Sequence, residues 1–196
     1  MTLTTLQTVA KLKVTDFSGF NKPAKNKGAR GQLIELALGI PNSSKLTDLV
    51  DGELKTFTVG ESIAVTQLNH CLAEIIEDRV SFADSKVGAK LKQTIYVGFT
   101  RTNEYVGTEV LNEETHAEHY YQLREDYDYI SAEIRVAFDE GKELSTVTGP
   151  NGLLQIRTKA SKSKAGNYTP LMFAGQQLKD KGMAFYLCGQ FGKTFV

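Results

Sequence analysis

The chain has few of the residues that build disulfide frameworks or membrane spans. Its 196 residues include two cysteines, four prolines and no tryptophan. Cys71 and Cys188 are too few for a disulfide framework and are not spaced as a pair of metal ligands. No stretch approaches the roughly 18 apolar residues of a transmembrane helix, and the first residues lack the basic and apolar regions of a signal peptide. We therefore expect a cytoplasmic protein with no membrane partner and with reduced, buried thiols.

The sequence also lacks an excess of charge of either sign. Lys and Arg total 23, and Asp and Glu total 23, so the formal net charge is zero. A surface that binds nucleic acid must then come from local segregation of charge. The hydrophobic fraction of 41% and charged fraction of 23% are those of an ordinary globular protein. The length predicts a single domain, residues 1–196, with room for two lobes.

Hydrophobic periodicity predicts a protein in which helices and strands alternate. Apolar residues at intervals of three and four predict helices over residues 6–12, 31–38, 68–80 and 116–141. Alternation and β-branched content predict strands over residues 52–59, 62–67, 91–100, 104–111, 153–156 and 184–188. We expect the second of these strands to pair with or neighbour the first, and residues 21–30 and 175–182 to form loops.

The segment NSSKLTDLVDGELK, residues 42–55, brings acidic and basic residues to the start of a predicted strand. Side chains alternate along a strand, so Glu53 and Lys55 project from one face while Leu54 points to the other. Asp48 lies a few residues upstream and can bend back to the same place. We therefore expect two carboxylates and an ammonium group on one open face.

These three groups have the chemistry of a metal-dependent phosphodiesterase. Carboxylate oxygens suit Mg²⁺, which keeps several waters and also binds substrate phosphate. The metal neutralises charge on the phosphoryl and leaving oxygens, while a lysine holds or polarises the attacking water. The motif predicts a nuclease in which Asp48 and Glu53 bind magnesium and Lys55 is catalytic.

Three alternatives stay open. A short acidic and basic pattern also occurs on solvated strand faces that carry no chemistry. Asp51 is a rival for the first carboxylate, although beside Gly52 it has the character of a turn residue. Glu35, on an otherwise apolar helix, is either an exposed acid or a third carboxylate that supports the metal site.

A basic segment follows the predicted strand at 153–156. Arg157, Lys159, Lys162 and Lys164 occur within eight residues, and no acid interrupts them. A solvated surface loop is one interpretation. The other is a loop that contacts phosphates and guanine edges, because both are recognised by Arg and Lys.

Four blocks stand in order along the chain: KNKGARGQLIELALG from 25, NSSKLTDLVDGELKT from 42, NGLLQIRTKASKSKAG from 151 and AFYLCGQF from 184. Together with QLREDYDYI from 122, they resemble the MutH mismatch-repair endonuclease family and its restriction-enzyme relatives that cut at GATC. The resemblance covers residues 25–191. It implies a restriction-endonuclease-like, PD-(D/E)xK α/β core: a mixed central sheet flanked by helices, with two lobes forming a DNA cleft.

The family's active-site positions match residues of this chain. The resemblance implies that Asp48, Glu53 and Lys55 form the catalytic triad and that Glu35 is a carboxylate near the metal. A further active-site lysine precedes a strand in the family, and here Lys90 matches it. Lys92, two residues on, is the alternative.

The family's DNA-contacting positions are also matched. Arg157 and Lys159 fall on the recognition loop that Lys162 and Lys164 extend, and Tyr186 falls on the tyrosine near the adenine methylation site. Two lysines of the last block are replaced here, by Cys188 and Gly189.

The implied activity is magnesium-dependent cleavage of double-stranded DNA at or near a GATC-like site. A type II restriction enzyme is the leading interpretation, acting as a monomer or as a transient dimer on DNA. The alternatives are a methyl-directed nicking endonuclease and a non-catalytic DNA-binding module of the same fold. Because the chain ends at Val196, before much of the family's last helix, activation by a MutL-like partner is not expected.

Overall fold

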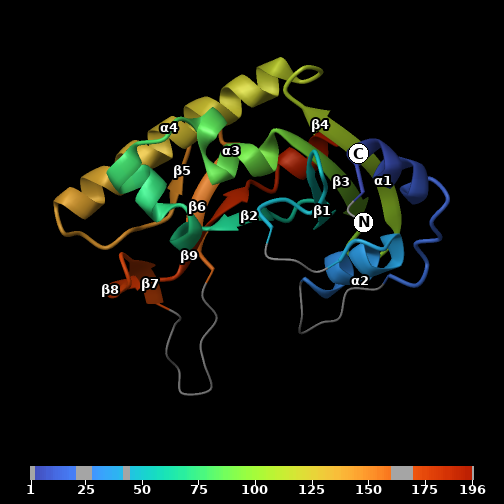
Figure 1. Ribbon diagram of the computed structural model, residues 1–196, viewed down its shortest axis with the longest axis horizontal. Coiled ribbons are helices and arrows are strands. Elements are labelled where there is room, and N and C mark those ends of the chain that lie inside the picture. The colour runs from blue at the N-terminus through green and yellow to red at the C-terminus, as the bar shows by residue number, and fades with distance from the viewer. Residues whose placement is uncertain (1–2, 21–27, 42–44, 160–169, 196) are drawn as a thin grey trace. The chain divides into compact units, whose positions relative to one another are not determined.

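The computed structural model describes residues 3–20, 28–41, 45–159 and 170–195. The chain forms a mixed α/β fold that divides into two compact units (Figure 1). The first unit comprises residues 1–63, 89–117 and 189–196, and the second comprises residues 64–88 and 118–188. Within the described ranges, no helix is both long and apolar enough to cross a membrane.

The first unit is built on a three-stranded mixed sheet. Its strands are β1 (Glu53–Thr58), β3 (Gln93–Phe99) and β4 (Tyr105–Asn112), in the order β1-β3-β4. Strand β1 runs parallel to β3, and β3 runs antiparallel to β4. Parallel neighbours require a crossover, so the chain passes through the second unit before it returns by helix α3 (Lys86–Leu91) to begin β3.

Two helices complete the first unit, α1 (Thr5–Leu12) and α2 (Ala29–Leu38). Helix α1 begins with a capping box between Thr4 and Gln7, which satisfies two amide groups of its first turn. Helix α2 has apolar residues at positions 33, 34, 37 and 38. Ile34 and Leu38 are buried with Leu54, whereas residues 33 and 37 are exposed. The apolar stripe of α2 is therefore narrower than its sequence indicated.

The second unit holds a four-stranded sheet, a two-stranded ribbon and a long helix. The sheet has the order β2-β9-β6-β5 and consists of β2 (Ile63–Gln67), β5 (Val147–Thr148), β6 (Leu154–Thr158) and β9 (Met183–Leu187). The ribbon pairs β7 (Pro170–Phe173) with β8 (Gln176–Lys181). Helix α4 (Ala117–Asp139) packs on the sheet, where the ring of Tyr127 stacks with that of Phe185, with centroids 5.9 Å apart.

Most predicted elements are confirmed, and four predictions are wrong. Residues 29 and 30, expected in a loop, begin α2, while residues 21–27 of that predicted loop lie outside the described residues. Strand β2 pairs with β9 and not with β1, because β1 takes β3 as its neighbour. Residues 68–80 form a 3₁₀ turn (Leu68–His70) and a π-helical turn (Glu74–Asp78) instead of one α-helix. Residues 176–181, expected in a loop, form β8, since a turn with Gly175 at φ 76° folds them back on β7.

A 3₁₀ turn (Phe82–Asp84) precedes α3, and another (Phe191–Phe195) follows β9.

Candidate active site

Strand β1 places its acid and its lysine on one face, as the alternation predicted. The Nζ of Lys55 lies 2.5 Å from Oε1 of Glu53, whose side chain is 1% exposed. Leu54, between them, points into the apolar core of the first unit. A carboxylate this deeply buried is stable as an ion only when positive groups and N–H donors surround it.

Asp48 bends back onto the strand through two reciprocal hydrogen bonds. Its backbone N–H donates to Oε2 of Glu53 at 3.1 Å, and its own Oδ2 accepts the N–H of Leu54 at 3.2 Å. The turn between them closes tightly at Gly52, where a Cβ atom would lie 2.7 Å from the carbonyl oxygen of Gln93. The local chain thus brings the carboxylates of Asp48 and Glu53 together.

Asp51 is engaged elsewhere. Its Oδ1 accepts the backbone N–H of Thr5 at 2.7 Å and the Thr5 hydroxyl at 2.9 Å, at the first turn of α1. This carboxylate fastens α1 to the turn before β1. The structure therefore favours Asp48 over Asp51 as the first acid of the motif.

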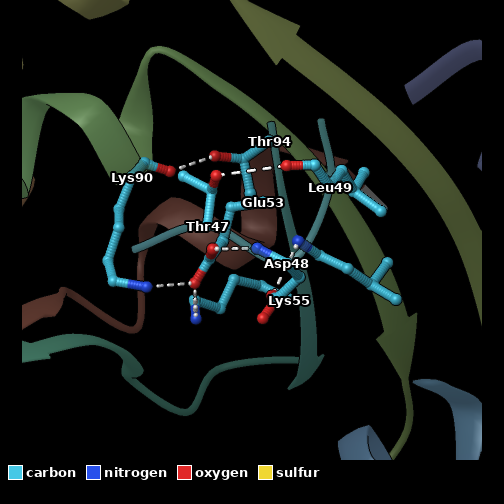
Figure 2. A network of polar contacts seen from close by, with 8 residues as sticks. Thr47, Asp48, Leu49, Glu53, Lys55, Lys90 and Thr94 are labelled. Atoms are coloured by element: carbon cyan, nitrogen blue, oxygen red, sulfur yellow. Dashed lines mark hydrogen bonds and ion pairs between the residues drawn. The ribbon is translucent and has the colours of Figure 1, made fainter. Parts of the chain in front are cut away.

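A second lysine reaches the same carboxylate from α3. The Nζ of Lys90 lies 2.8 Å from Oε1 of Glu53, and the lysine side chain is 15% exposed (Figure 2). Lys92 follows the end of the helix, and its side chain is exposed. Of the two lysines that the sequence left open, Lys90 is the one that joins the cluster.

Thr94 holds this lysine in place, and its role was not predicted. It pairs directly with Glu53 in the β1–β3 register, and its hydroxyl donates to the carbonyl oxygen of Lys90 at 2.8 Å (Figure 2). A buried threonine at the start of a strand is ordinary in a sequence. The fold brings the end of α3 to this hydroxyl, which also interacts with the side chain of Tyr96.

Crowding of carboxylates shows in the electrostatics of the cluster. Burial raises the pKa of Asp48, and the charge of Glu53 raises it further, while Lys55 opposes both. Burial likewise raises the pKa of Glu35 on α2, with the charge of Asp48 as the next cause. Glu35 therefore lies within the field of the other two acids. Three carboxylates against the two ammonium groups of Lys55 and Lys90 leave one negative charge in excess.

These donors fit a magnesium ion, although the protein supplies few of its ligands. Among the described residues, no set of three or more His, Cys, Asp or Glu side chains is arranged to hold a metal. The pair Asp48 and Glu53 offers hard oxygen donors. With Glu35 counted, the carboxylates of the cluster exceed its ammonium groups by one negative charge, which favours a cation. Mg²⁺ commonly takes only one or two carboxylates and fills its other positions with water and phosphate oxygens.

The predicted DNA-contacting residues lie in the second unit. Arg157 on β6 and Tyr186 on β9 project from the same face of the sheet, and the guanidinium carbon lies 4.3 Å from the ring centroid of the tyrosine. Burial raises the pKa of the Tyr186 hydroxyl, and the charge of Arg157 opposes this. Lys159, just after β6, is exposed, while Lys162 and Lys164 lie outside the described residues.

The chain matches no protein-family model and no curated protein.

Proposed function

We propose that this protein is a magnesium-dependent, site-specific DNA endonuclease with a PD-(D/E)xK active site. The observation that carries the proposal is the cluster on Glu53: a buried carboxylate that contacts Asp48 through N–H···O bonding and two lysines by ion pairs. A charged strand face without chemistry would be solvated, whereas Glu53 is 1% exposed. Burying this much charge costs stability, so a functional reason is expected.

Each side chain has a distinct part in the proposed reaction. Asp48 and Glu53 would hold the magnesium ion, with Glu35 adding negative charge nearby. The bound metal supplies neutralisation of the scissile phosphate. Lys55, fixed against Glu53 but 22% exposed, orients the attacking water. Lys90 pairs with the same oxygen of Glu53 and stabilises negative charge as it develops on the phosphate. The water oxygen bonds to phosphorus as the bond from phosphorus to the leaving oxygen breaks in line, the water gives up a proton to solvent, and the leaving oxygen takes one from solvent.

DNA recognition is assigned to the second unit. Arg157 carries donors suited to O6 and N7 of guanine, and Lys159 a charge suited to phosphate, as do Lys162 and Lys164 by their sequence. Arg157 on β6 and Lys159 just after it share the second unit with Tyr186, and these are the positions for which the resemblance implied a GATC-like target. Cleavage of both strands would make the protein a type II restriction enzyme.

Strand-resolved cleavage of short duplexes tests the proposal. Purified wild type would be incubated with Mg²⁺ and three duplexes whose GATC site is unmethylated, hemimethylated or fully methylated. We expect cutting at GATC that EDTA abolishes. Cuts in both strands indicate restriction, and a cut in one strand indicates a nicking enzyme. If no duplex is cut, the proposed activity is wrong.

Two alanine variants locate the chemistry. Lys55→Ala should lower the single-turnover rate by about 10²–10⁴-fold, the range for a positioned catalytic group. The matched control is Lys92→Ala, which removes the same charge from an exposed side chain and should cut like wild type. A folded Lys55→Ala protein that cuts at the wild-type rate would remove this cluster as the active site.

A further inference from the structure

Helix α4 buries a carboxylate that takes no part in the proposed chemistry. Asp126 is 0% exposed, and both of its oxygens accept hydrogen bonds from backbone N–H groups. The donors are Asn151 at 2.7 Å on Oδ1, and Leu153 and Leu154 at 2.8 Å on Oδ2. Three N–H donors on one buried carboxylate form a strong, directional anchor.

The anchored segment is the turn of residues 149–154 that leads into β6. The turn closes on itself through Gly149, whose N–H donates to the Leu154 carbonyl at 2.9 Å. A Cβ atom at Gly149 would lie 2.2 Å from Cγ of Asp126, so the turn sits directly against the carboxylate. Asn151 adds a side-chain bond to the carbonyl of Gln122 on α4, at 3.1 Å.

The anchor fixes both strands that carry the predicted DNA-contacting residues. Leu154, bonded directly to Asp126, begins β6, and Arg157 follows three residues later, roughly 10 Å along an extended strand. The carbonyl of Leu153 accepts the N–H of Cys188 at 2.8 Å, which ties the end of β9 to the same turn. Tyr186, on β9, lies two residues before Cys188.

We propose that Asp126 is a positioning residue for DNA recognition, acting through the 149–154 turn to hold Arg157 and Tyr186 in their stacked arrangement. The inference rests on the proposed endonuclease function. The contact with the ring of Tyr186 restricts where the guanidinium group of Arg157 can lie, and reading O6 and N7 of guanine requires a well-placed guanidinium group. Movement of the turn shifts β6 and the end of β9 and thereby breaks this arrangement.

Asp126→Asn is the direct perturbation. An amide keeps the size of the carboxylate but offers one acceptor oxygen, so its NH₂ group must face an N–H donor of the turn. Asp128→Asn is the matched control, since it makes the same substitution two residues along α4 on a side chain that is 57% exposed.

The first measurement is a double-mutant cycle with Arg157→Ala, read as affinity for a GATC duplex and for an AATT duplex, with Ca²⁺ replacing Mg²⁺. We expect Asp126→Asn to weaken GATC binding by about tenfold, the loss of one base contact, with little change for AATT. In the Arg157→Ala background it should weaken GATC binding little further. A purely structural role predicts the same further loss in both backgrounds, and that result would overturn the proposal.

The second measurement needs no DNA. Stacking on Tyr186 should shift the Arg157 Nε–H resonance upfield through the ring current. We expect that shift to be lost in Asp126→Asn and kept in Asp128→Asn; a shift unchanged in Asp126→Asn would refute the positioning role. If the wild type binds no duplex, the endonuclease proposal and the role in DNA recognition are both wrong, while this measurement still decides whether Asp126 holds Arg157 against Tyr186.

A milder variant tests the inference if the Asp126→Asn protein does not fold. Asn151→Ala keeps the backbone N–H bond to Asp126 and removes only the side-chain bonds to α4. It should produce the same selective weakening and the same NMR change with smaller amplitude. Equal weakening for both duplexes would contradict the inference.

Discussion

Lys55 and Lys90 both stabilise the buried carboxylate of Glu53, and we expect either lysine to compensate for the loss of the other. Both ammonium groups lie on the same oxygen, Lys55 at 2.5 Å and Lys90 at 2.8 Å. Replacing either by methionine keeps an apolar stem of similar length but removes the charge. The other lysine then still faces the carboxylate, as does the backbone N–H of Asp48. Replacing both leaves that carboxylate buried without a cation.

The expected magnitudes follow from burial. A hydrogen bond to a charged group contributes about 1.5–3 kcal/mol, and with one partner left we expect each single variant to lose about 1 kcal/mol. Glu53 is 1% exposed, so the double variant strands an uncompensated buried charge, at a cost of about 3–5 kcal/mol. The double variant should therefore lose about 1–3 kcal/mol more than the sum of Lys55→Met and Lys90→Met.

Urea unfolding at neutral pH in EDTA measures the free energy of unfolding without metal. The four proteins compared are the wild type, the two single variants and the double variant. The slope with urea should be the same throughout, so that midpoints report stability. The control is Lys92→Met, which replaces an exposed lysine next to α3 and should unfold like wild type. If the double variant loses the same unfolding free energy as the two single variants added together, within about 0.5 kcal/mol, the lysines do not share Glu53.

Two further predictions concern the same cluster. The folded-state pKa of Glu35 is raised above its ordinary 4.5, so the native state loses stability as pH rises through that folded pKa. Glu35→Gln should therefore be more stable than wild type at neutral pH, and thermal melts of the two proteins should converge below pH 4.5. Thr94→Val removes the hydroxyl bond to the Lys90 carbonyl. It should cost about 1 kcal/mol in urea and slow single-turnover cleavage, whereas unaltered cleavage would show that Lys90 needs no such support.

The local part of the candidate site could be predicted because its geometry is local. Asp48, Glu53 and Lys55 lie within one turn and one strand, and strand alternation alone sets two of them on a common face. The pairing of β2 could not be predicted in this way. Alternation specifies which face of a strand is buried but not which strand lies beside it. Strand β2 pairs with β9, which lies more than a hundred residues away in the sequence.

The choice between Lys90 and Lys92 depended on a helix that periodicity did not reveal. Helix α3 spans only six residues, Lys86–Leu91, too few for a stripe of apolar positions to stand out. Because Lys90 lies in its last turn and Thr94 begins the adjoining strand beside Glu53, the helix end delivers one lysine to the site and leaves the next exposed. A parallel register between distant strands is what creates this proximity.

Asp126 shows that a signal can be present in a sequence and still be missed. Residues 123, 127, 130 and 134 form the buried stripe of α4, and position 126 lies three residues after the first of them and four before the third. A carboxylate at such a position should be exposed at the edge of the stripe or satisfied inside it. The donors to Asp126 are the backbone N–H groups of Asn151, Leu153 and Leu154, and nothing local in the sequence connects this turn to α4. An acid on the apolar stripe of a helix is therefore worth testing as the partner of backbone N–H groups in a distant turn, because a buried carboxylate needs donors.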